Sequence, residues 1–297
     1  ASDLIVTGRE PPQNLVDAAI RVALDEDLGL AGDITTNATV AANATANAVI
    51  AARKPGVVAG LALAETAFRA IAPETDFTIE IGDGEKVKPG AVIARISGNA
   101  RALLTAERVA LNFLGRLSGI ATLTRRYVDR VSGTHAKIVD TRKTTPGLRA
   151  FEKYAVRCGG GYNHRVGLFD AVLIKDNHIV AAGGIASAIK AAKAAAGHMI
   201  KIEVEVDTLA QLEIVMREKV DCVLLDNMMP ADLVKAVAIV GGRCLTEASG
   251  GVNLETVTEI AQTGVALISV GALTHSASVL DLGLDFIASP EQATIQA

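Results

Sequence analysis

From about residue 118 onward, short apolar segments alternate with stretches whose apolar residues recur at helical spacing. Each apolar segment ends in polar residues and is followed by a predicted helix, of which 188–196 and 209–219 are the clearest. Strand–helix alternation of this kind is typical of βαβ units around a parallel sheet. The six predicted strands cover 136–142, 171–177, 201–207, 222–227, 243–250 and 266–272.

This pattern predicts an α/β fold. Six strands, each followed by helical sequence, favour a closed barrel, and an open doubly wound sheet is the alternative. No Gly-x-Gly-x-x-Gly motif follows the first predicted strand. Its absence counts against the dinucleotide-binding version of the open sheet.

The first 116 residues have a different pattern. Residues 12–28 are predicted as a helix, because their apolar residues recur at helical spacing and Gly29 follows the end. Residues 33–40 are predicted as a turn and a short extended piece. Runs of β-forming residues separated by Gly turns fill 48–100, around one more helix. An α+β domain accounts for this mixture.

A predicted helix over 102–117 separates the two patterns. Its apolar positions cover most of the circumference, which indicates burial between two layers. Arg108 lies on its narrow polar stripe and would face something other than the helix's own core. We predict two domains, an N-terminal one over 1–116, to which about 277–297 returns, and a catalytic one over 117–276.

Composition excludes several classes of partner. The chain has no Trp, 3% aromatic residues and a net charge of −4, which argues against nucleic-acid and anionic-membrane partners. No apolar run is long enough to span a bilayer, and the first residues do not resemble a secretory signal. The three cysteines show no close pairing or metal-binding spacing. We expect buried free thiols in a reducing cytoplasm.

Polar residues end every predicted strand of the second half, and in barrel enzymes the catalytic residues lie at these ends. Residues 140–178 carry seven Lys or Arg against four Asp or Glu, whereas the rest of the chain is acidic. A locally basic mouth concentrates anionic substrates, and arginine binds carboxylates and phosphates bidentately. The strand-end residues are Asp140, Thr141, Arg142, Lys143, Lys175, Asp176, Asn177, His178, Glu203, Glu205, Asp207, Asp226, Asn227, Glu247, Ser249, Gly250, Gly251 and Gly271.

Two further features belong to this mouth. His164 and Arg165 directly follow three consecutive glycines, which favours a role for His164 in the site over a purely structural one. Gly-rich loops after the last two strands are typical of the phosphate site of barrels. Glu205 and Asp226, on neighbouring strands, could hold Mg²⁺ or bond ribose hydroxyls. The residues alone predict an enzyme that binds a substrate with carboxylates and a phosphate group.

Longer motifs resemble a known family. The segments 107–122, 140–149, 152–178 and 247–252 are similar to those of quinolinate phosphoribosyltransferases, and the similarity runs in order from residue 23 to 276. The resemblance implies an N-terminal α+β sandwich domain and an incomplete (β/α) barrel. It implies a homodimer and the conversion of quinolinate and phosphoribosyl pyrophosphate to nicotinate mononucleotide, pyrophosphate and CO₂, with Mg²⁺, in NAD biosynthesis.

The resemblance also implies roles for individual residues. Quinolinate would be bound by Thr141, Arg142, Lys143, His164, Arg165 and Lys175, and by Arg108 of the partner subunit. Lys175, Glu205 and Asp226 would be catalytic. Glu205 and Asp226 would contact the ribose hydroxyls and Mg²⁺, directly or through water, although Glu203 fits the same strand face as Glu205. The 5′-phosphate would be bound by Ser249, Gly250, Gly251, Gly271 and Ala272.

Three alternatives stay open. A paralogous phosphoribosyltransferase could use the same scaffold on another aromatic acid. An aldolase could form a Schiff base on Lys175, but the arginines and the phosphate loops do not need such a lysine. A metabolite sensor without catalysis is the third, and the intact Lys175, Glu205 and Asp226 argue against it. The sequence does not predict assembly beyond a dimer, or the order of substrate binding.

Overall fold

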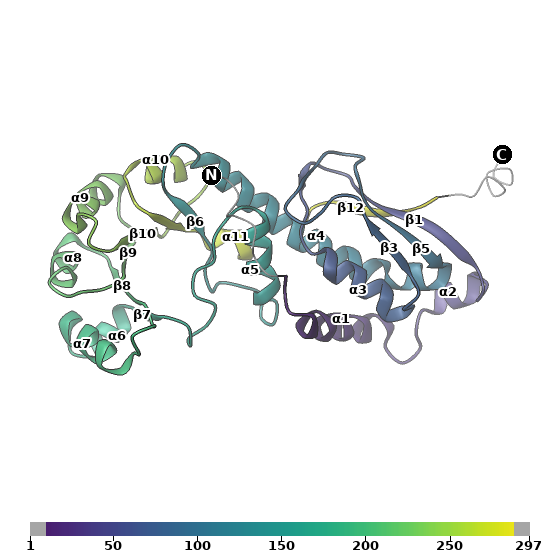
Figure 1. Ribbon diagram of the computed structural model, residues 1–297, viewed down its shortest axis with the longest axis horizontal. Helices are drawn as coiled ribbons and strands as arrows, with labels where there is room; N and C mark the ends of the chain where they lie inside the picture. Colours follow the sequence, from purple (N-terminus) through teal and green to yellow (C-terminus); the bar gives the residue numbers. More distant parts are fainter. Residues whose placement is uncertain (1–9, 288–297) are drawn as a thin grey trace. The chain divides into compact units, whose positions relative to one another are not determined.

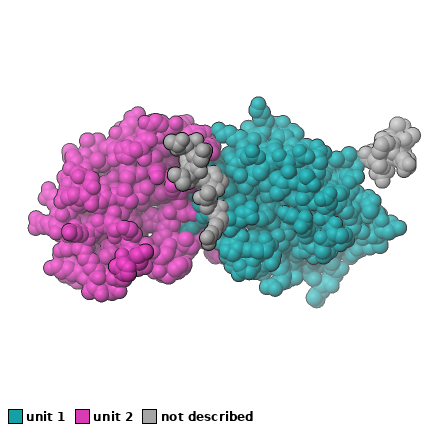
Figure 2. Space-filling model, viewed as in Figure 1, with its two compact units in different colours: residues 1–123, 150–160, 277–297 teal, residues 124–149, 161–276 magenta. Residues whose placement is uncertain are grey.

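The computed structural model describes residues 10–287, which form two compact units (Figure 2). Unit 1 comprises residues 10–123, 150–160 and 277–287, and unit 2 comprises 124–149 and 161–276. Residues 1–9 and 288–297, which the domain prediction also included, lie outside the described residues.

The predicted boundary at 116/117 differs from the division in the structure. It falls inside helix α4 (Ala100–Arg130), which continues well beyond the predicted end at 117. Residues 150–160, assigned to the catalytic domain by the prediction, belong to unit 1. They lie there because Tyr154 donates a hydrogen bond to the partly buried Asp83 at 2.7 Å, and Glu152 pairs with Arg116 at 2.8 Å.

Unit 2 contains one six-stranded parallel sheet in the order β6-β11-β10-β9-β8-β7. The edge strands β6 and β7 are consecutive in the chain, so the ring of strands stays open between them and the barrel is incomplete. This confirms the α/β class and the incomplete barrel that the resemblance implies, whereas the closed barrel favoured by the strand pattern alone is wrong. The strands are β6 (Lys137–Val139), β7 (Val172–Ile174), β8 (Ile202–Val206), β9 (Cys222–Asp226), β10 (Leu245–Ser249) and β11 (Leu267–Ser269).

Helices follow each strand from β7 onward, and Figure 1 shows α7 to α10 ranged outside the strands. Side chains alternate along each strand, so the two faces of the sheet carry different kinds of residue. In β8, Ile202, Val204 and Val206 are buried and apolar, whereas Glu203 and Glu205 share the opposite face. The helices are α6 (Asp176–Ala181), α7 (Ile185–Ala195), α8 (Leu209–Val215), α9 (Pro230–Val240), α10 (Val257–Gln262) and α11 (Ala272–His275).

Unit 1 is an α+β domain with an antiparallel sheet in the order β12-β1-β5-β3. Strand β12 comes from the last described residues and pairs with β1 along its length. The strands are β1 (Thr45–Ala52), β3 (Asp76–Ile79), β5 (Val92–Asn99) and β12 (Leu282–Ile287), and β2 (Gly56–Val57) pairs with β4 (Lys86–Val87). The helices besides α4 are α1 (Gln13–Leu28), α2 (Ile34–Thr39), α3 (Leu61–Ile71) and α5 (Arg149–Cys158).

Two local predictions for unit 1 need comment. The predicted helix over 12–28 is confirmed as α1, with Pro12 at its N-cap. The expected turn and extended piece at 33–40 is wrong, because α2 forms there. The Asp33 carboxylate accepts a hydrogen bond from the Thr36 backbone at 2.9 Å, which caps this short helix.

Glycines in α4 let the returning chain pass close to the helix. A side chain at Gly119 would collide with the Ser278 carbonyl, and one at Gly115 would lie 2.9 Å from Val279. The Leu280 backbone N–H donates to the Gly115 carbonyl at 3.0 Å. Within residues 10–287, none of the helices combines the length and the apolar character that crossing a bilayer requires.

Candidate active site

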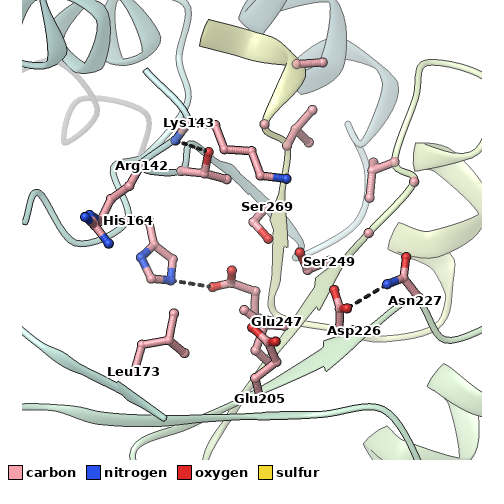
Figure 3. Close-up of a pocket in the computed structure, with 18 of the residues that line it drawn as sticks. Arg142, Lys143, His164, Leu173, Glu205, Asp226, Asn227, Glu247, Ser249 and Ser269 are labelled. Atoms are coloured by element: carbon pink, nitrogen blue, oxygen red, sulfur yellow. Dashed lines mark hydrogen bonds and ion pairs between the residues drawn. The ribbon is translucent and has the colours of Figure 1, made fainter. Parts of the chain in front are cut away.

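A cavity of about 720 Å³ opens at the carboxyl ends of the unit 2 strands (Figure 3). All of its lining residues belong to unit 2. Because the strands are parallel, their carboxyl ends bring together residues more than 100 positions apart in the chain. The predicted site residues that line it are Thr141, Arg142, Lys143, His164, Arg165, Lys175, Glu205, Asp226, Ser249, Gly250, Gly251, Gly271 and Ala272.

Other lining residues had no assigned role, although Glu247 and Asn227 were among the predicted strand-end residues. Leu173 and Leu224 provide apolar surface, and Glu247 and Ser269 provide buried polar groups. Leu173, Leu224 and Ser269 were not predicted; strand alternation is the signal that could have found them, since Leu173 lies two residues before Lys175 and Leu224 two before Asp226. The rest of the lining comes from Asn227, Val252, Val270 and His275.

Arg142 and Arg165 give one side of the cavity a double positive charge. Partial burial, followed by the charge of Arg142, lowers the pKa of the Arg165 guanidinium. Both Nε atoms are buried and have no hydrogen-bond acceptor among residues 10–287. Arg165 also donates from Nη1 to the Ala171 carbonyl at 3.2 Å, which anchors its head. Two crowded guanidinium groups with unused donors suit a ligand with more than one carboxylate.

The backbone N–H and carbonyl of Lys143 are both hydrogen-bonded to side chains. Its N–H donates to the Thr141 hydroxyl at 3.0 Å, and its carbonyl accepts from the Thr274 hydroxyl at 2.6 Å. These bonds connect the loop after β6 to the short helix after β11. The loop therefore presents Thr141, Arg142 and Lys143 from a fixed backbone.

The loop that carries His164 is fixed by a fully buried carboxylate. Asp140 accepts hydrogen bonds from the Asn163 amide at 2.6 Å and from the His164 backbone N–H at 2.8 Å. The imidazole itself reaches Glu203 at 2.9 Å and Glu247 at 3.6 Å through Nε2. Figure 3 shows the ring directed toward Glu247 at the floor of the cavity. Burial, followed by the charge of Glu203, raises the pKa of the Glu247 carboxyl.

Lys175 and two carboxylates form the opposite side. The Lys175 ammonium lies 2.9 Å from Glu205 and is about half exposed, so it can also turn toward a bound anion. Partial burial, followed by the charges of Glu205 and Asp207, raises the pKa of Asp226. Glu205 lines the cavity, whereas Glu203 lies beneath it against His164. This geometry favours Glu205 over Glu203 for contact with a ligand.

Glu205 and Asp226 fit a divalent cation. They stand on adjacent strands β8 and β9 and supply carboxylate oxygens, the donors that Mg²⁺ prefers. Burial is the main cause of the raised pKa of Asp226, and the charges of Glu205 and Asp207 add to it; a bound cation would relieve that repulsion.

The loops after β9 and β10 meet at a glycine. Gly250 has a φ of +90°, and a Cβ there would collide with the Asn227 amide and lie 2.9 Å from its backbone nitrogen. Asn227 itself has a φ of +53° and donates its backbone N–H to the Ser249 carbonyl at 2.8 Å. These loops and Gly271 bring backbone close to the cavity without bulky side chains.

Arg108 is not among the residues that line this cavity. It is an exposed residue of α4 in unit 1. Two other polar residues of α4 are engaged within unit 1, because Thr105 contacts Asp33 at 3.1 Å and Arg116 contacts the buried Glu152. The outward direction of Arg108 agrees with the predicted stripe, and its role in a partner's site stays a prediction.

The chain matches two family models. Residues 33–118 match "Quinolinate phosphoribosyl transferase, N-terminal domain", and residues 120–285 match "Quinolinate phosphoribosyl transferase, C-terminal domain".

Individual relatives agree with this match. The nicotinate-nucleotide pyrophosphorylase [carboxylating] of Mycobacterium leprae is 46% identical, over 90% of this chain and 95% of that protein. A mitochondrial quinolinate phosphoribosyltransferase [decarboxylating] of Nicotiana tabacum is 44% identical, over 89% of this chain and 80% of that protein. The crystal structure of NadC from Streptococcus pyogenes superposes with a TM-score of 0.90 at 40% identity, and covers 95% of this chain and all of that one. The chain belongs to the quinolinate phosphoribosyltransferase family.

Proposed function

We propose that this chain transfers the phosphoribosyl group of phosphoribosyl pyrophosphate to quinolinate and releases CO₂. The products are nicotinate mononucleotide and pyrophosphate, in a step of NAD biosynthesis. One observation carries the proposal. Paired guanidinium groups, a lysine–carboxylate pair and glycine loops meet in one cavity of a chain that belongs to this family.

The basic side of the cavity is the proposed quinolinate site. Arg142 and Arg165 would bind the two carboxylates, with Lys143 and Thr141 beside them. His164 would border the pyridine ring. The unused guanidinium donors and the lowered pKa of Arg165 support this assignment, since a dianionic ligand would neutralise charges that now repel.

The acidic side is the proposed phosphoribosyl site. Lys175 would contact a quinolinate carboxylate and phosphoribosyl oxygens, and Glu205 and Asp226 the ribose hydroxyls. The open backbone of the two glycine loops supports a 5′-phosphate site, where N–H groups can approach an anion closely. The residues proposed to bind that phosphate are Ser249, Gly250, Gly251, Gly271 and Ala272.

These positions give a simple reaction path. The pyridine nitrogen attacks C1′ of the ribose, and the bond to pyrophosphate breaks through an oxocarbenium-like state. Glu205 and Asp226 stabilise the cationic sugar, and Lys175 stabilises the departing anion. The ribosylated ring nitrogen is cationic, so it stabilises the carbanion left when CO₂ departs, and a solvent proton completes the product. The chain mainly supplies orientation and electrostatics.

Mg²⁺ is the proposed cofactor. Glu205 and Asp226 would hold it directly or through water. When bound, it would neutralise charge on the pyrophosphate group.

We further propose a homodimer in which Arg108 of one subunit reaches the quinolinate site of the other. The exposure of Arg108 supports this proposal, since Thr105 and Arg116 of the same helix are engaged within unit 1. We expect neither nucleic acid nor membrane as a partner. We propose a cytoplasmic location, which suits the three free cysteines of the structure.

The decisive experiment measures CO₂ release from carboxyl-labelled quinolinate by the purified protein. Release should require both phosphoribosyl pyrophosphate and Mg²⁺, and omission of either should abolish it. Lys175→Ala should lower kcat by about 100-fold or more, because it removes charge stabilisation at the leaving group. The matched control is Lys190→Ala, which changes an exposed lysine of α7. No release by folded protein with both components present would contradict the proposal.

Three further measurements separate the alternatives. A paralogous enzyme for another aromatic acid would turn over nicotinate in preference to quinolinate. A Schiff-base aldolase would be trapped by borohydride on Lys175 with a carbonyl substrate. A sensor would bind quinolinate in calorimetry without turnover.

A further inference from the structure

The imidazole of His164 lines the cavity, yet both of its nitrogens are engaged inside the protein. Nδ1 accepts a hydrogen bond from the backbone N–H of Arg165 at 2.8 Å. Nε2 lies 2.9 Å from a Glu203 oxygen and 3.6 Å from a Glu247 oxygen. The ring is 14% exposed, so only a small part of it reaches the cavity.

The Arg165 contact determines where the ring proton lies. A backbone N–H can only donate, so Nδ1 must offer a lone pair. A doubly protonated imidazolium has no such lone pair, and neither has the tautomer with a proton on Nδ1. The ring proton is therefore on Nε2, which donates it to Glu203.

The hydrogen bond from the Arg165 backbone N–H to Nδ1 also argues against a metal ion bound to Nε2 beneath the cavity. The ligand atoms of His164, Glu203 and Glu247 lie within 4.8 Å of one another, a spacing that a cation could bridge. A metal on Nε2 would move the ring proton to Nδ1, where it would face the Arg165 N–H donor. The backbone geometry thus favours a hydrogen bond over a metal site.

We propose that Glu203, backed by Glu247, is a positioning residue that fixes His164 as a neutral ring with its proton on Nε2. His164 then gives the substrate a carbon edge, and neither a positive charge nor a transferable proton. The positive charges for the carboxylates come from Arg142 and Arg165. This inference rests on the proposed binding of quinolinate beside His164, whereas the ring's protonation pattern can be measured without any substrate.

The first test is a two-bond ¹H–¹⁵N spectrum of protein with ¹⁵N-labelled histidine rings, at pH 7. The chain has five histidines, and a His164→Phe variant identifies the signal by its loss. We expect a protonated Nε2 and an unprotonated Nδ1, unchanged on addition of Mg²⁺ or Zn²⁺. A proton on Nδ1, alone or with Nε2, would overturn the proposal, and so would a shift of the ring proton caused by either metal.

The second test uses two substitutions of Glu203. Glu203→Gln keeps an oxygen acceptor on the same side-chain shape, whereas Glu203→Leu removes it. We expect Glu203→Leu to raise the KM for quinolinate about tenfold, with the KM for phosphoribosyl pyrophosphate nearly unchanged. Glu203→Gln should stay within about threefold of the wild type for both. Glu213→Gln, at an exposed position of α8, is the control.

The two tests separate the possible failures. Equal effects of Glu203→Leu on both KM values would show a general structural role and overturn positioning. If Glu203→Leu does not fold, the proposal is still tested by the ring protonation in the wild-type spectrum and by the KM values of Glu203→Gln. A protein without turnover whose His164 shows the expected pattern would contradict the proposed function and leave the fixed ring standing.

Discussion

Arg142 and Arg165 place two like charges side by side in a partly buried wall of the cavity, and burial with this repulsion lowers the pKa of Arg165. A guanidinium keeps its charge in such a place and presents a planar pair of donors. The chemistry of the side chain, and not only its sign, therefore matters at this position.

Arg165→Lys tests this point. Lysine retains the charge but loses the planar fork and the anchor to the Ala171 carbonyl. We expect the KM for quinolinate to rise about 10- to 100-fold while kcat changes less, in steady-state assays. Arg126→Lys, on the exposed face of α4, should behave as the wild type. Unchanged KM in Arg165→Lys would argue against bidentate binding.

Glu247 predicts a pH effect on stability. Its pKa is raised from 4.5 to about 8, so the folded protein holds a proton that the unfolded chain releases. A raised folded-state pKa stabilises fully below the unfolded value, and the contribution is lost as pH rises toward 8. The wild type should therefore lose thermal stability between pH 5 and 8.5.

Glu247→Gln should flatten this dependence, because glutamine does not titrate. Calorimetric melts across this range should show a difference in Tm between the two proteins that changes by about 2–4 °C per kcal/mol of linkage. Parallel curves for the two proteins would mean that Glu247 is not the group responsible.

At the scale of residues, the site was predictable for the side chains that directly follow a strand. Parallel strands bring their carboxyl ends to one edge, so Arg142, Lys175 and Asp226 could be grouped from the sequence. The engagement of His164 with Glu203 and Glu247 was not predictable. It depends on distances across strands and on which ring nitrogen faces a backbone N–H.

Among the elements, the loops after β9 and β10 depend on one another. Gly250 takes a left-handed φ directly against Asn227, whose own positive φ is maintained by a bond to Ser249. Neither loop can adopt this shape beside a side chain at position 250.

Gly250→Ala should therefore damage phosphate binding more than quinolinate binding. We expect the KM for phosphoribosyl pyrophosphate to rise about tenfold or more, with a loss of roughly 1–3 kcal/mol of stability from backbone strain. Gly242→Ala is a matched control, because Gly242 also has a positive φ, +75°, but has open space at its Cβ and lies away from the cavity. Equal kinetic effects of both variants would contradict the idea that contact with Asn227 matters.

The elements themselves were predicted well where periodicity is strong. All six predicted strands of the second half are present, because each is a short apolar run between polar ends. The end of the helix predicted at 117 was wrong, since α4 continues to Arg130. In the structure, Gly115 and Gly119 of this helix make room for residues 278–280. That contact is distant in the chain and leaves no local signal.

For the whole molecule, the proposed dimer makes a sharp prediction. Arg108→Ala and Lys175→Ala should each be inactive alone, because each removes one half of a shared site. Mixed and allowed to exchange subunits, they should regain about a quarter of wild-type activity, since half of the dimers are hybrids with one intact site of two. Turnover after mixing measures the recovery, and native mass spectrometry confirms the exchange. Exchange without recovery would place Arg108 outside the partner's site.

The two-part organisation was predictable from the change of pattern near residue 117, but the assignment of 150–160 was not. That segment is an amphipathic helix between two barrel strands, as any barrel helix would be. The Tyr154–Asp83 hydrogen bond is part of what joins it to unit 1, and sequence alone does not show that pairing.

The pairing of β12 with β1 has a consequence for biosynthesis. Without β12, strand β1 would be an edge strand with unpaired backbone groups. Residues 282–287 leave the ribosome more than 200 residues after 45–52, and after all the strands of unit 2. The strands of the barrel are thus all synthesised before β12 is available to pair with β1 in the N-terminal sheet. During this interval the unpaired edge of β1 is open to pairing with other chains, which makes it a site where aggregation can start and where a chaperone would protect the chain.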